Sequence, residues 1–138
     1  MHLQGNLNDV CKSITDEVDY VLAAAVIDLE SGLLLGISHK NEFFTQSFLD
    51  SLSASATELF RGASINYVEK LISNIRGNEP ERLIEQLHYS TEHTHHLMAV
   101  LPEKPDVLSL LVTDKSVNLG LGWSYLKSKL PDISGSCP

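Results

Sequence analysis

The sequence is poor in the features that mark several large classes of protein. Its only cysteines are Cys11 and Cys137, near opposite ends of the chain and without a CxxC spacing, so neither a disulfide framework nor a cysteine-rich metal site is expected. The longest apolar stretches are strand-sized, far short of the roughly 18 residues that a membrane span requires. The opening MHLQGNLNDV lacks the apolar run of a secretory signal. These shortages predict a protein of a reducing, cytoplasmic compartment that does not insert into membranes.

Basic residues are also few, with 10 Lys and Arg against 18 Asp and Glu and a formal net charge of −8. A surface with this excess repels phosphate backbones, which argues against nonspecific binding of nucleic acid or anionic membranes. The apolar content of 43% is that of an ordinary globular protein. A chain of 138 residues can bury a core without disulfides, so we expect one domain over 1–138, with its core at about 5–131 and a tail at 132–138.

The hydrophobic pattern predicts an α+β fold. Two apolar runs flank the turn signal Ser31–Gly32, which is typical of a β-hairpin, and Gly36 in the second run suggests a bulge or a close backbone approach. The segment 83–91 fits a strand by alternation but follows helix-start chemistry, so periodicity leaves it open. The predicted helices are 6–18, 42–61, 64–76 and 118–130, and the other predicted strands are 20–30, 33–40, 95–102 and 106–114. Hairpin-rich strands with helices between them favour an antiparallel sheet.

Capping residues set the expected ends of these helices. Asn41 is the candidate N-cap of the long helix, and Ser64 and Gly77 bound the helix that follows it. Pro131 is expected to end the last helix, whose apolar stripe predicts that Trp123 belongs to the core.

The histidines of STEHTHHLM are the candidate metal ligands. His93 and His95 would point to one face if both lay on a single strand, because side chains alternate along a strand. No cysteine joins them, however, and no HExxH-type spacing occurs. The pattern favours a polar hairpin tip over a metal site, and we expect no cofactor.

No catalytic constellation is recognisable in the sequence. Gly120 and Gly122 form a GxG, but neither a complete phosphate-binding fingerprint nor a GxSxG nucleophile elbow is present. Cys11 lies on the apolar stripe of the first helix, where a free cysteine behaves as a small hydrophobe. We therefore expect a protein that is not an enzyme.

The predicted helix at 42–61 has a wider apolar face than packing against one sheet requires. Its apolar residues spread over roughly 160°, whereas those of the first helix stay within roughly 100°. Either the next helix covers the surplus or a second copy of the chain does, and two-fold dimers are the commonest assemblies. We expect a dimer interface, in which Leu49 and Phe60, with Phe43, would otherwise face water. The residues predicted to form it are Phe44, Phe48, Leu49, Leu52, Leu59 and Phe60.

Three stretches resemble the roadblock family, which comprises the roadblock-type dynein light chains and their bacterial and archaeal relatives that regulate Ras-like GTPases. They are AAAVIDLESGLLLG (23–36), LDSLSASATELF (49–60) and LLVTDKSVNLGLGWSYLKSKL (110–130). The similarity extends over roughly 5–131. It implies a five-stranded antiparallel sheet between helices, in a layout similar to that of profilin, with 83–91 as the third strand.

The resemblance also implies a function. It suggests a homodimer made by pairing the long helices and an edge strand, and a non-catalytic scaffold that activates or localises a small Ras-like GTPase. The alternative is a ligand- or metal-binding sensory module on a similar sheet. The segment 62–80 is longer than the family pattern between the long helix and the third strand, which would reshape the surface beside the dimer helix. The acidic charge predicts that a GTPase partner presents a neutral or basic face.

Overall fold

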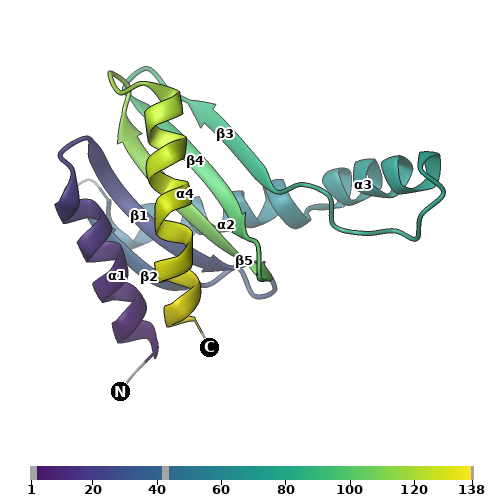
Figure 1. Ribbon diagram of the computed structural model, residues 1–138, viewed down its shortest axis with the longest axis horizontal. Coiled ribbons are helices and arrows are strands. Elements are labelled where there is room, and N and C mark those ends of the chain that lie inside the picture. Colours follow the sequence, from purple (N-terminus) through teal and green to yellow (C-terminus); the bar gives the residue numbers. More distant parts are fainter. Residues whose placement is uncertain (1–2, 42–43, 138) are drawn as a thin grey trace.

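The computed structural model describes residues 3–41 and 44–137, which form a five-stranded antiparallel sheet with helices on both faces (Figure 1). The order across the sheet is β2-β1-β5-β4-β3. The helices are α1 (Leu3–Glu17), α2 (Gln46–Arg61), α3 (Ala63–Ile75) and α4 (Leu119–Ser136), and the strands are β1 (Val21–Asp28), β2 (Leu34–His39), β3 (Gln86–Ser90), β4 (Thr94–Leu101) and β5 (Lys104–Asp114). The α+β fold and the expected order of elements, including the third strand, are confirmed.

Two apolar cores hold the helices to the sheet. On one face α1 and α4 pack side by side, and Leu7, Ile14 and Leu126 are buried beneath them (Figure 1). On the other face α2 buries Phe60 against residues such as Leu108. Neighbouring residues of the central strands point alternately into these two cores, which explains why β1 is a continuous apolar run.

Close packing of α1 on β2 depends on Gly36. A Cβ atom at Gly36 would lie 2.8 Å from the Cβ of Leu7. The pairing of β1 with β2 also shifts here, because Val26 is opposite Gly36 while Ile27 is opposite Leu34. Both expectations for this glycine, a bulge and a close approach, are therefore confirmed.

Gly122 has a similar role on the same face of the sheet. A Cβ atom there would lie 3.0 Å from Cδ1 of Leu97, so the GxG at 120–122 serves the packing of α4 on β4. Cys11 is fully buried, as expected, and burial raises the pKa of its thiol to about 12. Trp123 packs against this core but is only half-buried, so its predicted place in the core is correct only in part.

The long helix begins later than predicted. Its N-cap is Thr45, whose side chain accepts a hydrogen bond of 3.2 Å from the backbone N–H of Phe48. The carbonyl of Asn41 accepts a hydrogen bond from the backbone N–H of Phe44, and Asn41 does not cap the helix, so its expected capping role is wrong. Phe44 therefore precedes the helix, and Phe43 lies outside the described residues.

The last helix continues past its predicted end. Pro131 lies inside α4, which runs to Ser136, so the helix does not end at the proline as predicted, and residues 132–136 are helical. Ile133 is 2% exposed and belongs to the core beneath α1 and α4. Burial of this side chain offsets the backbone hydrogen bond that a proline forfeits inside a helix.

Three other boundaries also differ from the prediction. α1 begins at Leu3, earlier than residue 6, and α3 has Gly62 rather than Ser64 as its N-cap. The third strand is shorter than 83–91, because the backbone N–H groups of Leu83 and Ile84 donate to the side chain of Glu69.

Candidate interaction surface

The strand β3 forms one edge of the sheet. It pairs with β4 on one side, and no other strand of the described chain pairs with its second side. Of its side chains only that of Leu87 is partly buried. An unpaired strand edge offers backbone N–H and C=O groups to another chain, so this edge is a candidate for association.

The helix α2 covers one face of the sheet and leaves some of its own apolar side chains exposed to solvent near β3. Phe48 and Leu59 are each 41% exposed, and Leu52 is half-buried. Leu49 and Phe60 are 5% and 0% exposed, so the expectation that they would face water without a partner is wrong. They face the sheet, and the free stripe on α2 is narrower than the sequence suggested.

A groove of about 380 Å³ separates α2 from the end of the β3–β4 hairpin. The α2 side of the groove carries both serine and exposed apolar side chains, and the β3–β4 side carries two aromatic rings. The lining residues are Phe48, Ser51, Leu52, Ser55, Tyr89, Thr91 and His96, and we call this the α2–β3 groove. It combines apolar contact area with a few polar groups, which is the composition of protein binding surfaces.

His96 lines the groove and is almost fully buried. Its Nε2 lies 2.9 Å from Oγ1 of Thr94, whereas its Nδ1 is buried and has no hydrogen-bond partner among the described residues. Burial, assisted by the neighbouring His95, lowers the pKa of His96 and favours the neutral ring. Buried polar atoms are normally hydrogen-bonded, so Nδ1 of His96 is an exception, and because this atom is buried it is not open to a group from another molecule.

The predicted hairpin tip is confirmed, because β3 pairs with β4 and the histidine cluster spans their connection. His95 has Nδ1 2.7 Å from Oγ of Ser90 and Nε2 3.1 Å from the carbonyl of Lys115. His93 precedes β4 and is exposed, so it does not share a strand with His95. Within 3–41 and 44–137 there is no group of three or more His, Cys, Asp or Glu that could hold a metal ion.

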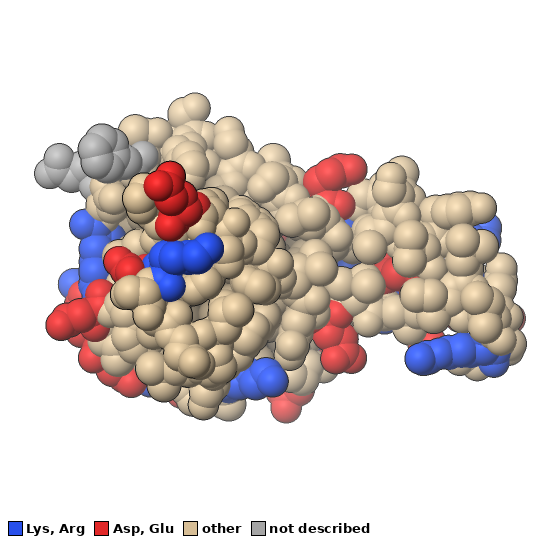
Figure 2. Space-filling model, turned by 90° about the horizontal axis from the view of Figure 1, so that it is seen from above, with Lys and Arg blue, Asp and Glu red and all other residues tan. Residues whose placement is uncertain are grey.

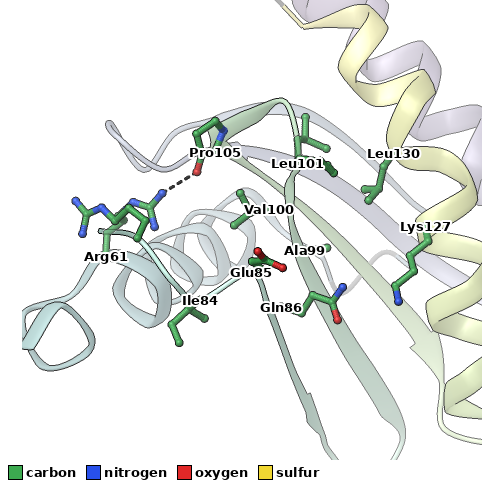
Figure 3. Close-up of a pocket in the computed structure, with 12 residues that line it drawn as sticks. Arg61, Ile84, Glu85, Gln86, Ala99, Val100, Leu101, Pro105, Lys127 and Leu130 are labelled. Carbon is green, nitrogen blue, oxygen red and sulfur yellow. Dashed lines mark hydrogen bonds between the residues drawn. The ribbon is translucent and has the colours of Figure 1, made fainter. Parts of the chain in front are cut away.

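A second hollow, of about 400 Å³, lies near the start of β3 (Figure 3). Glu85 contributes a carboxylate to the lining of this pocket. Arg61 points toward Pro105 and donates a hydrogen bond of 2.7 Å to its carbonyl. Among the described residues that line this pocket there is no Ser, Cys or His to serve as a nucleophile or base.

The sequence interpretation missed parts of this surface. Tyr89 and His96 were not expected in it, since alternation along a strand does not reveal which helix leaves a face uncovered. Of the six predicted interface residues, the structure brings Phe48 and Leu52 into the groove and leaves Leu59 exposed on α2. Phe44 packs against the core beneath α2 and contacts the ring of Phe48, with their centroids 5.3 Å apart.

No helix in the described part of the chain has the length and apolar content to cross a membrane.

Comparison with known proteins finds similar folds among solved structures. No protein-family model matches the chain, and no curated protein sequence matches it significantly. Among solved structures, the gliding protein MglB of Thermus thermophilus is similar with a TM-score of 0.69 and 14% identity over 99% of this chain and 92% of that one. A Roadblock/LC7 domain of Streptomyces avermitilis gives a TM-score of 0.68 at 10% identity, over 94% of this chain and 95% of that domain.

An MglB solved in a tetrameric arrangement gives a TM-score of 0.71 at 16% identity, over 99% of this chain and 91% of that one. These similarities extend over nearly the whole chain. The chain therefore has the roadblock fold, as its sequence resemblance suggested.

Proposed function

We propose, from the roadblock fold of this chain, that it acts as a homodimeric, non-catalytic scaffold that binds and regulates a small Ras-like GTPase. The observation that carries the proposal is the free edge of β3 beside the exposed apolar stripe of α2. The roadblock family, which the sequence resembles, includes regulators of Ras-like GTPases. The tetrameric arrangement of one MglB supports the idea that proteins with this fold assemble.

The homodimer would use both features at once. Antiparallel pairing of β3 with β3 of a second copy would continue the sheet, and it would bring the two α2 stripes together across a two-fold axis. Phe48, Leu52 and Leu59 would then lose their contact with water. Ser51 and Ser55 are small enough for close approach of two helices.

The GTPase would bind to the assembled dimer. The net charge of −8 favours a GTPase surface that is neutral or basic. In this proposal the chain contributes no reacting group, so any change in the rate of GTP hydrolysis would come from how the dimer positions the switch segments of the GTPase. The sensory-module alternative gains no support from His95, because both of its ring nitrogens are already hydrogen-bonded within the hairpin.

The test uses the small Ras-like GTPases encoded in the genome that encodes this chain. Each is purified, loaded with GDP or a non-hydrolysable GTP analogue, and titrated with the dimer by calorimetry, and single-turnover GTP hydrolysis is then measured with and without it. The proposal expects saturable binding to at least one GTPase, tighter in one nucleotide state. If none of them binds in either state while the chain is dimeric, the GTPase part of the proposal is wrong.

A further inference from the structure

The helix α3 buries polar side chains and exposes apolar ones. Its buried residues are polar, with Glu69 2% exposed and Ser73 fully buried. The carboxylate of Glu69 accepts hydrogen bonds of 2.5 Å from the N–H of Leu83 and 3.1 Å from the N–H of Ile84. Arg82 lies 3.9 Å from the same carboxylate and also bonds Asn66. Polar contacts to the returning segment therefore hold this helix in place.

The opposite face of α3 is apolar and open to solvent. Tyr67 is 64% exposed, Val68 43%, Leu71 44% and Ile75 85%. We call these four residues the α3 stripe. Their spacing places them on one face of the helix, and that face carries no charged side chain. Seen from above, the arm that contains α3 stands out from the body, and the visible part of it is mostly uncharged (Figure 2).

This arrangement reverses the usual source of helix stability. An isolated helix of 13 residues is marginal in water, and most helices in proteins are stabilised by burying an apolar face. The α3 stripe exposes on the order of 400 Å² of apolar surface, the size of patch that often marks an interaction site on a monomer. The missing burial is therefore expected to come from another molecule.

The position of the arm indicates which molecule. α3 extends away from the body on the side of β3, the strand whose outer edge is free (Figure 1). A second copy that pairs with β3 would occupy this same side. The α3 stripe would then adjoin the two features proposed as the interface, namely the β3 edge and the α2–β3 groove.

We propose that α3 is a dimerisation arm, which reaches past β3 of its own chain and packs its apolar stripe on the second copy of the homodimer. This inference rests on the proposed homodimer but not on the GTPase. A stable interface buries about 800 Å² on each partner. The α3 stripe would add its uncharged apolar surface to that of the exposed side chains on α2 and β3.

The experiment compares two substitutions on the same turn of the arm in the full chain. Leu71→Asp places a charge within the α3 stripe, whereas Lys70→Asp places the same side chain at an exposed position outside it, about 100° around the helix from Leu71. The dimer dissociation constant is measured for each by sedimentation velocity over a dilution series. We expect Leu71→Asp to raise this constant at least ~10-fold and Lys70→Asp to change it by less than ~3-fold.

Two further variants separate the arm from the rest of the interface. Leu71→Ser removes apolar area without adding charge and should weaken the dimer in the same direction, while circular dichroism confirms that both variants are folded. Phe48→Asp tests the α2–β3 interface itself. If Phe48→Asp abolishes the dimer and both Leu71 variants leave it intact, the homodimer stands and the arm inference is wrong.

Three other outcomes would also overturn the proposal that α3 is a dimerisation arm. If Leu71→Asp reduces a larger assembly to a dimer of unchanged affinity, the arm joins dimers to one another and the inference is overturned. If it leaves the dimer unchanged and abolishes GTPase binding, the stripe belongs to the GTPase and the inference is likewise overturned. If the unmodified chain is a monomer at micromolar concentration, the homodimer and the arm fail together.

Discussion

The ring of Tyr89 stacks on the ring of His96, with their centroids 4.5 Å apart and their planes inclined by 13°. The stack joins the edge strand β3 to β4 and forms the aromatic wall of the α2–β3 groove. Because His96 is almost fully buried and has a lowered pKa, the folded protein favours its neutral form. Protonation of this ring would place a charge on the surface where we propose that a second copy docks.

The free energy of unfolding should consequently fall on mild acidification. The pKa of His96 lies below its ordinary value of 6.5 in the folded chain, so the unfolded chain binds more protons between these two values. The stabilising contribution of the neutral ring is fully present above pH 6.5, declines as the pH falls through that window, and changes no further below the folded pKa. Urea unfolding at a series of pH values checks this, with His96→Phe as the comparison. If His96→Phe keeps the same decline, another group is responsible.

Gly36 and Gly135 form a matched pair for testing the contact between α1 and β2. A Cβ atom at Gly36 would meet Leu7 at 2.8 Å, whereas one at Gly135 would have nothing within 4 Å. Gly36→Ala should therefore destabilise the protein by about 1–3 kcal/mol, through overpacking. Gly135→Ala should be neutral or stabilising by up to about 1 kcal/mol, because alanine favours the helix. Equal effects of the two substitutions in urea unfolding would contradict the described contact.

The anchor of α3 can be tested at Glu69. Glu69→Ala leaves the N–H groups of Leu83 and Ile84 without their acceptor, which costs about 1–3 kcal/mol when such groups are buried. We expect these two amides to exchange with deuterium faster, while amides of β4 and β5 are unaffected. Glu69→Gln retains an acceptor oxygen and should restore part of the protection, and Glu79→Ala, at an exposed position, should change nothing. Protection that is unchanged in Glu69→Ala would show that the arm is held by other contacts.

The sequence predicted those parts of the fold in which local chemistry and packing agree. Ser31–Gly32 marks a turn in which Gly32 has a φ of 76°, and the apolar runs on either side form the strands β1 and β2. The helix boundaries were less predictable. Asn41 and Thr45 are both residue types that cap helices, and Thr45 is the N-cap here, directly after Phe44, which packs on the core. Ile133 extends α4 beyond Pro131 for a similar reason, since its burial depends on distant residues.

The candidate surface was predictable only in outline. A wide apolar face on α2 was visible in the sequence, but periodicity cannot distinguish the residues that face the sheet, such as Leu49, from those left free, such as Phe48. For α3, periodicity predicted the helix correctly but not which face is buried. That choice depends on hydrogen bonds from Leu83 and Ile84 to Glu69, which are separated from it by 14 and 15 residues in the sequence.

The central claim, that the α2–β3 face is a two-fold interface, is tested most directly by the mass of the chain in solution. Sedimentation equilibrium at micromolar concentration should give twice the 15.2 kDa of one chain for the unmodified protein. Phe48→Asp would place a charge from each copy near the two-fold axis and should give a monomer, whereas Ala54→Asp, at an exposed position of α2 outside the groove, should remain a dimer. A monomeric unmodified protein, or a dimer that Phe48→Asp leaves intact, would contradict the account.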